Sequence, residues 1–147
     1  MCSHVQWSQL AGLVGFMVIV TLGWPVDGRG VQPGAALALY GCVENTGAEA
    51  EVAGALLCDA QPTPRLTERA ERDNLLVRHG ALVIEVDKTS ISETAGLKAG
   101  DVIYRVGGVD VADADAASEN LATLQTRSDT VVNFLRGGRP YRVKLRR

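Results

Sequence analysis

The hydrophobic pattern of the second half of the chain predicts a series of short strands. The run at 80–86 is apolar and β-branched, too short for a helix and bounded by glycine and aspartate, and 102–106 has the same character. Residues 131–135 and 141–145 flank a Gly-Gly pair and predict a hairpin. One face of its last strand should be buried, because apolar and basic residues alternate there: Tyr141, Val143 and Leu145 against Arg142, Lys144 and Arg146.

Helical signals lie between the predicted strands. Ser90 and Glu93 have the spacing of a capping box, which predicts one helical turn. A proline after Thr63 predicts a further short helix over 64–73. Residues 115–125 predict an amphipathic helix, since their apolar members share one face at helical spacing: Ala117, Leu121 and Leu124.

The N-terminal third carries a different pattern. No residue from 5 to 26 is charged, and the apolar core at 10–23 approaches the ~17–25 residues that a membrane-spanning helix needs. Trp7 and Trp24 bracket it at a helical separation of roughly 25 Å, which suits indoles at two membrane interfaces. We therefore expect residues 1–26 to be a transmembrane anchor, with a signal peptide or a core helix as alternatives.

Residues 27–51 are rich in glycine, alanine and glutamate, with Pro33 among them, and are expected to form a flexible linker. Two cysteine chemistries remain open there. Cys42 could form a disulfide with Cys58 in an oxidising compartment, or it could be lipidated, because residues 39–42 faintly resemble a lipoprotein processing site.

Composition excludes several function classes. A formal charge of −2 gives no basic field for nucleic acid, and the basic residues near the C-terminus fit a solvated sheet face better than a lipid or acidic partner. Three cysteines without Cys-x-x-Cys spacing indicate no metal, and no phosphate loop or cofactor motif occurs, so we expect no cofactor. The histidines are His4 and His79, neither placed as a catalytic base, and no hydrolase motif is present; we expect no enzymatic activity.

Two adjacent motifs resemble a known family. The stretch AGLKAGDVI at 95–103, followed by VGGVDV at 106–111, is similar to the bacterial, circularly permuted PDZ domain. The resemblance implies an α+β fold over residues 52–147, a small, partly open β-barrel or sandwich of five to six strands with two short helices.

The resemblance also implies a peptide site. PDZ domains hold a free C-terminal carboxylate with the backbone N–H groups of an apolar-Gly-apolar loop, and the peptide adds as a strand beside an amphipathic helix. The best match for the loop is Ala53, Gly54 and Ala55, followed by a strand with a free edge at 56–59. The expected groove residues are Ala53, Gly54, Ala55, Leu56 and Cys58, opposite Ala117, Leu121 and Leu124, for which core packing is the alternative.

Together with the expected anchor at 1–26, the resemblance implies a membrane-tethered module that binds protein C-termini or extended peptides, with an adaptor or regulatory role outside the cytoplasm, in the envelope. Similar domains occur in high-temperature-requirement serine proteases and in site-2 and carboxyl-terminal processing proteases. A second hypothesis is therefore the non-catalytic regulatory part of a protease system. A third is a structural PDZ subunit of a secretion machine, which shares the order anchor, linker and PDZ domain.

Overall fold

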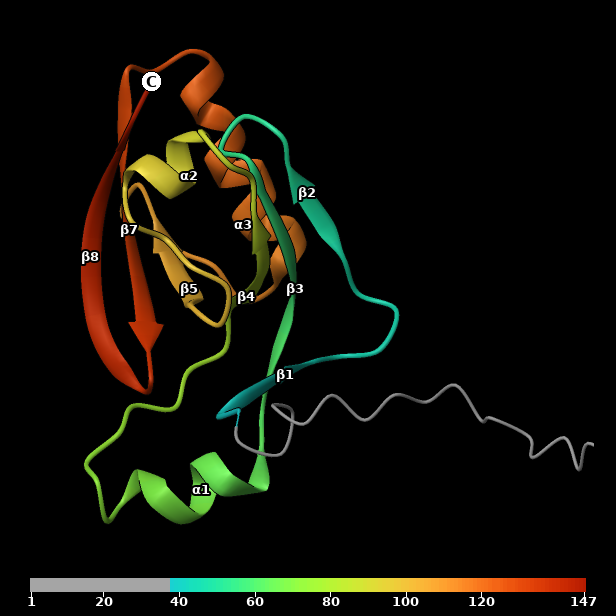
Figure 1. Ribbon diagram of the computed structural model, residues 1–147, viewed down its shortest axis with the longest axis vertical. Coiled ribbons are helices and arrows are strands. Elements are labelled where there is room, and N and C mark those ends of the chain that lie inside the picture. The colour runs from blue at the N-terminus through green and yellow to red at the C-terminus, as the bar shows by residue number, and fades with distance from the viewer. Residues whose placement is uncertain (1–37) are drawn as a thin grey trace, which may run out of the picture. The chain divides into compact units, whose positions relative to one another are not determined.

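The computed structural model describes residues 38–147 (Figure 1). The predicted anchor, residues 1–26, lies outside that part of the chain, as do residues 27–37 of the expected linker. Among the described residues, no helix has the length and apolar character needed to cross a bilayer. The helices are α1 (Pro64–Ala70), α2 (Ile91–Thr94), α3 (Ala114–Ala122) and the 3-10 turn η2 (Thr123–Gln125). The strands are β1 (Tyr40–Cys42), β2 (Ala48–Ala50), β3 (Ala55–Pro62), β4 (Ala81–Val86), β5 (Val102–Val106), β6 (Val109–Asp110), β7 (Asp129–Arg136) and β8 (Arg139–Arg146).

The strands form one antiparallel sheet with the order β1-β3-β4-β5-β7-β8. The short strand β2 pairs with β3 and β6 pairs with β5, which gives eight strands in place of the five to six expected. The additional strands β1 and β2 come from the segment predicted to be a linker. Figure 1 shows β2 running beside both β3 and α3.

Side chains on the two faces of β3 enter two separate hydrophobic clusters. Ala55 and Leu57 join a cluster with α3, whereas Cys58 and Ala60 join one with α1. β3 is therefore buried on both faces and forms the wall between the two clusters. The main buried side chains of the first are Leu57, Val83, Ile103, Val106, Leu121, Leu124, Val132, Phe134 and Leu145; those of the second are Tyr40, Cys58, Leu66, Leu82, Val102 and Leu135.

Helix caps hold the connections in place. The Ser90 half of the predicted capping box is present, because the Ser90 hydroxyl accepts the Glu93 N–H at 3.1 Å. The Glu93 carboxylate turns back as expected, but it accepts the N–H of Thr89 and not that of the N-cap residue Ser90. The Asp113 carboxylate accepts the Ala116 N–H at 2.8 Å at the start of α3. Thr63 occupies the N-cap position of α1 without capping it, because its hydroxyl instead donates to the carbonyls of residues 38 and 39.

The segment between α2 and β5 is fixed by a buried ion pair. The Asp101 carboxylate, 1% exposed, accepts two hydrogen bonds from the Arg136 guanidinium, at 2.8 and 2.7 Å, and one from the Lys98 N–H at 2.8 Å. Arg136 also donates to the Gly96 carbonyl, and the hydrogen bond to Asp101 raises the pKa of Arg136. Gly100, at φ +94°, supplies the left-handed residue before Asp101. This network explains the glycines and the aspartate of the motif at 95–103.

Candidate functional site

The loop 51–54, between β2 and β3, concentrates hydrogen-bond donors on one point. The N–H groups of Ala53 and Gly54 both donate to the Ala50 carbonyl oxygen, at 3.0 and 2.8 Å, and the Gly54 N–H also lies 3.2 Å from the Glu51 carbonyl. Gly54 itself adopts φ +69°, a left-handed conformation that glycine tolerates. Such a pair of converging N–H groups can hold a carbonyl or carboxylate oxygen.

The opposite side of this loop is tied to α2. The Ala53 carbonyl accepts the Ser92 N–H and the Gly54 carbonyl accepts the Asp87 N–H, each at 3.0 Å. A Cβ atom added to Gly54 would lie 2.3 Å from the Cβ of Ser90. Because the loop's carbonyls are bonded to the region of α2, its N–H groups are held facing away from α2.

A groove wall is provided by α3 and η2. Ala117, Leu121 and Leu124, the three residues expected from helical spacing, are at most 1% exposed and pack in the first cluster. The Asp59 carboxylate fixes the start of α3 by accepting the Ala114 N–H at 2.9 Å. The expected helix face therefore points toward β3.

The strand register is one residue away from the expected one. Ala55 and Leu57 share the cluster with α3. Leu56 points outward at 39% exposure, and Cys58 faces the second cluster. Successive strand residues point to opposite faces, so the groove side of β3 carries Ala55 and Leu57, and the expected residues Leu56 and Cys58 do not line it.

Cys58 has a different partner: it forms a disulfide with Cys42 of β1, with the Cα atoms 5.6 Å apart. Of the two cysteine chemistries left open, the structure has the disulfide, so the Cys42 thiol is not free for lipidation. Cys42 is exposed and Cys58 is fully buried. The bond ties β1 to the middle of β3.

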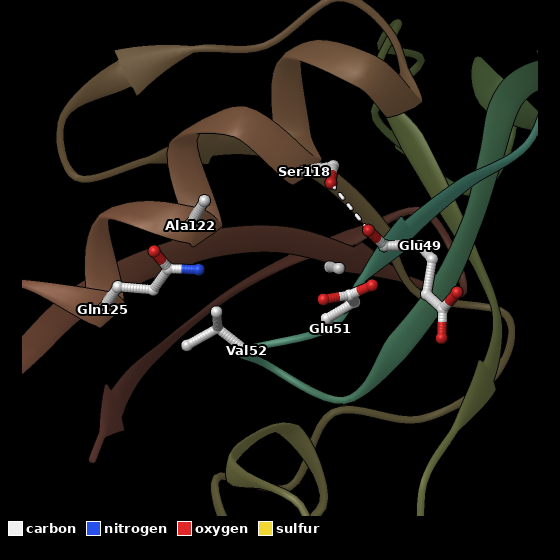
Figure 2. Close-up of a pocket in the computed structure, with 7 residues that line it drawn as sticks. Glu49, Glu51, Val52, Ser118, Ala122 and Gln125 are labelled. Atoms are coloured by element: carbon white, nitrogen blue, oxygen red, sulfur yellow. Dashed lines mark hydrogen bonds between the residues drawn. The ribbon is translucent and has the colours of Figure 1, made fainter.

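The expected free edge of β3 is paired, and that prediction was wrong. Ala48 lies opposite Leu57 and Ala50 opposite Ala55, in an antiparallel ladder between β2 and β3. On its other side β2 meets α3, where the Ser118 hydroxyl donates to the Glu49 carbonyl at 2.9 Å (Figure 2). The remaining hollow beside Ser118, also lined by Val52 and Ala122, measures about 120 Å³. A segment of the chain itself thus lies between β3 and α3.

His79 is exposed in the loop before β4, and His4 lies outside the described residues. Within residues 38–147, no cluster of three or more His, Cys, Asp or Glu side chains could hold a metal ion. The candidate site in this part of the chain is the loop 51–54, with β3 and α3.

Comparison with known proteins identifies the family of the chain. The sequence profile of the PDZ domain matches residues 56–146. The chain belongs to the PDZ domain family. The chain is 32% identical over 77 residues to a probable periplasmic serine protease (do/HhoA-like) of Haemophilus influenzae. It is also 32% identical over 82 residues to a probable periplasmic DegP-like serine endoprotease of Halomonas elongata. These matches span 52% and 56% of this chain but only 16% and 17% of those proteins.

Solved structures with a similar fold include the HtrA-type protease AlgW with a decapeptide, at 23% identity and a TM-score of 0.48, covering 69% of this chain and 28% of that one. The HtrA3 PDZ domain bound to a phage-derived ligand has 26% identity and a TM-score of 0.42, covering 57% and 73%. The PDZ domain of EpsC from Vibrio cholerae has 18% identity and a TM-score of 0.41, covering 66% and 99%. A PDZ domain is a binding module, and the match to the proteases is confined to a PDZ region.

Proposed function

We propose that this chain is a PDZ module that binds the free C-terminus or an extended segment of another protein by strand addition to β3. The observation that carries the proposal is the convergence of the Ala53 and Gly54 N–H groups on one oxygen, at 3.0 and 2.8 Å. A terminal carboxylate at that point would accept the same two hydrogen bonds, and the peptide before it would run along β3 beside α3. The proposed contact residues are Ala53, Gly54, Ala55, Leu57, Ala117, Leu121 and Leu124.

The proposal predicts a preference for a free carboxylate. A peptide with a free C-terminus should bind the full chain about tenfold more tightly than its amidated form, because hydrogen bonds to an ionised acceptor are roughly twice as strong as neutral ones. NMR titration up to about millimolar peptide measures both affinities, and the shifts should centre on the amides of Ala53 and Gly54. Equal affinities, or shifts centred on β7 and β8, would contradict a carboxylate site at this loop.

We further propose that the module works in the cell envelope, outside the cytoplasm, and is tethered by the apolar residues 1–26. The relatives described as periplasmic support the compartment, and the uncharged run supports the tether. Carbonate extraction of membranes containing the full chain tests the tether, since an anchored chain stays with the bilayer and a peripheral one is released.

A regulatory role in a serine-protease system is a second candidate function. It is favoured by the 32% identity to two proteins described as periplasmic serine proteases. If a protease is encoded beside this chain, adding the chain should change its rate of peptide cleavage. An unchanged rate would leave the adaptor role as the better proposal.

A further inference from the structure

The β2 segment lies in the groove in the manner of a bound peptide. It runs antiparallel to β3, with its C-terminal end at the loop 51–54, and there the Ala50 carbonyl oxygen takes the hydrogen bonds of Ala53 and Gly54. The Ala50 side chain is 3% exposed and packs in the first cluster, with Ala48 packed against that cluster two residues earlier. Glu49, between them, points to solvent.

The groove helix also contacts this segment directly. Ser118 of α3 donates its hydroxyl hydrogen to the Glu49 carbonyl at 2.9 Å, which is a contact between the groove wall and the backbone of the added strand (Figure 2). The segment therefore uses strand pairing, inward side chains, the loop N–H groups and a helix side chain at once. These are the four kinds of contact that the proposed function assigns to a partner peptide.

The chain before β2 is fixed to the domain at several points. The Cys42–Cys58 disulfide joins β1 to β3, at a sequence separation of 16. The Tyr40 side chain is 7% exposed, and its hydroxyl accepts the Arg78 N–H at 3.0 Å. The Thr46 hydroxyl accepts the Asp59 N–H at 3.1 Å. These contacts hold the segment near the groove at its N-terminal end, and the loop 51–54 holds it at its C-terminal end.

We propose that Ala48–Ala50 is an internal ligand of the groove, that the Cys42–Cys58 disulfide holds it there, and that a partner peptide binds only when this segment leaves. The inference rests on the proposed function. The segment also indicates which ligands the groove accepts: peptides with small apolar side chains at the last and third-last positions, because those are the positions that Ala50 and Ala48 fill.

Tethering makes this competition strong. A segment joined to its site by a short loop has an effective concentration of about millimolar. If the segment itself has an intrinsic affinity of about 10 µM, it would lower the apparent affinity of a partner peptide by about a hundredfold. Reduction of the disulfide removes one of the attachments that hold the segment, and Cys42 is exposed to a reductant. The loss of the loop constraint should shift the equilibrium toward the open groove.

The test uses the full chain and a fluorescent peptide with the sequence of residues 43–50 and a free carboxyl group. Affinity is measured by anisotropy for the oxidised protein, the reduced protein, Ala50→Lys and the matched control Glu49→Lys. Lysine at 50 would place a charge in the buried cluster and expel the segment, whereas lysine at 49 faces solvent. Hydrogen exchange of residues 48–50 reports separately whether the segment has left the groove.

We expect the reduced protein and Ala50→Lys to bind the peptide at least about tenfold more tightly than the oxidised protein and Glu49→Lys. Saturating peptide should also speed the exchange of residues 48–50 in the oxidised chain. If all four proteins bind the peptide with equal affinity and residues 48–50 stay protected from exchange, Ala48–Ala50 is not an internal ligand, and the peptide binds at another surface of the domain. Rapid exchange of residues 48–50 in Ala50→Lys without any peptide binding would instead contradict the proposed function, and this inference with it.

Discussion

The contact between Gly54 and Ser90 allows a quantitative test of how the binding loop is supported. Gly54→Ala places a Cβ atom 2.3 Å from the Ser90 Cβ, where carbon atoms normally approach to about 3.5–4.0 Å. The left-handed φ of +69° costs an alanine about 1–2 kcal/mol, and overpacking adds about 1–3 kcal/mol. We expect Gly54→Ala to lower the free energy of unfolding by about 2–5 kcal/mol.

The double variant separates the two costs. Ser90→Gly removes the obstructing Cβ and should cost only a few tenths of a kcal/mol on its own, about the difference between serine and glycine as N-caps. In that background Gly54→Ala should retain only the backbone cost, so the two changes should be non-additive by about 1–3 kcal/mol. Urea unfolding followed by circular dichroism measures all four proteins. Additivity within about 0.5 kcal/mol would refute the packing of the loop on the start of α2.

Two further predictions concern the motif at 95–103. Asp101→Asn should lower the free energy of unfolding, measured in urea, by about 2–3 kcal/mol, because it breaks the bidentate pair of a buried carboxylate with Arg136; the loss is limited because the Arg136 guanidinium can partly rehydrate. The control Asp129→Asn, in an exposed pair, should cost less than about 1 kcal/mol. Equal losses in the two variants would contradict this account. Gly100→Val should lower the free energy of unfolding by about 1–3 kcal/mol, because valine is strained at the φ of +94° that Gly100 adopts. In the control Gly41→Val, where the added side chain meets open space, the free energy of unfolding should change by less than about 0.5 kcal/mol. Equal urea midpoints for the two variants would mean that valine is not strained in the turn before β5.

The parts of the fold that were predictable from sequence are those with strong local signals. β5 (Val102–Val106) has the predicted bounds, since glycine and aspartate precede a run that is apolar except for Arg105. The hairpin of β7 and β8 follows its Gly-Gly turn, and Ser90 caps α2 as predicted. Each of these elements has both a periodic pattern and a residue that begins or ends it.

The groove was less predictable because its decisive contacts are long-range. The apolar run Ala55-Leu-Leu-Cys58 enters hydrophobic clusters on both faces, so alternation could not show which side faces α3, and the expected register was one residue off. β1 and β2 are short and include glycine, alanine and glutamate, which have weak strand propensity. They form because the edge of β3 supplies backbone partners, a context that a local pattern does not contain.

The far edge of the sheet has a consequence for the protein in concentrated solution. Among the described strands, β8 pairs only with β7, so its outer backbone groups are open to another chain. Four basic side chains, Arg139, Arg142, Lys144 and Arg146, lie along it and are exposed, and of these Lys144 is paired with Asp129 at 2.6 Å. Two copies meeting edge to edge would bring like charges together, so electrostatic repulsion should keep the protein dispersed at low ionic strength. Salt screens that repulsion within about 8 Å at 0.15 M, so colloidal stability should fall as salt is added.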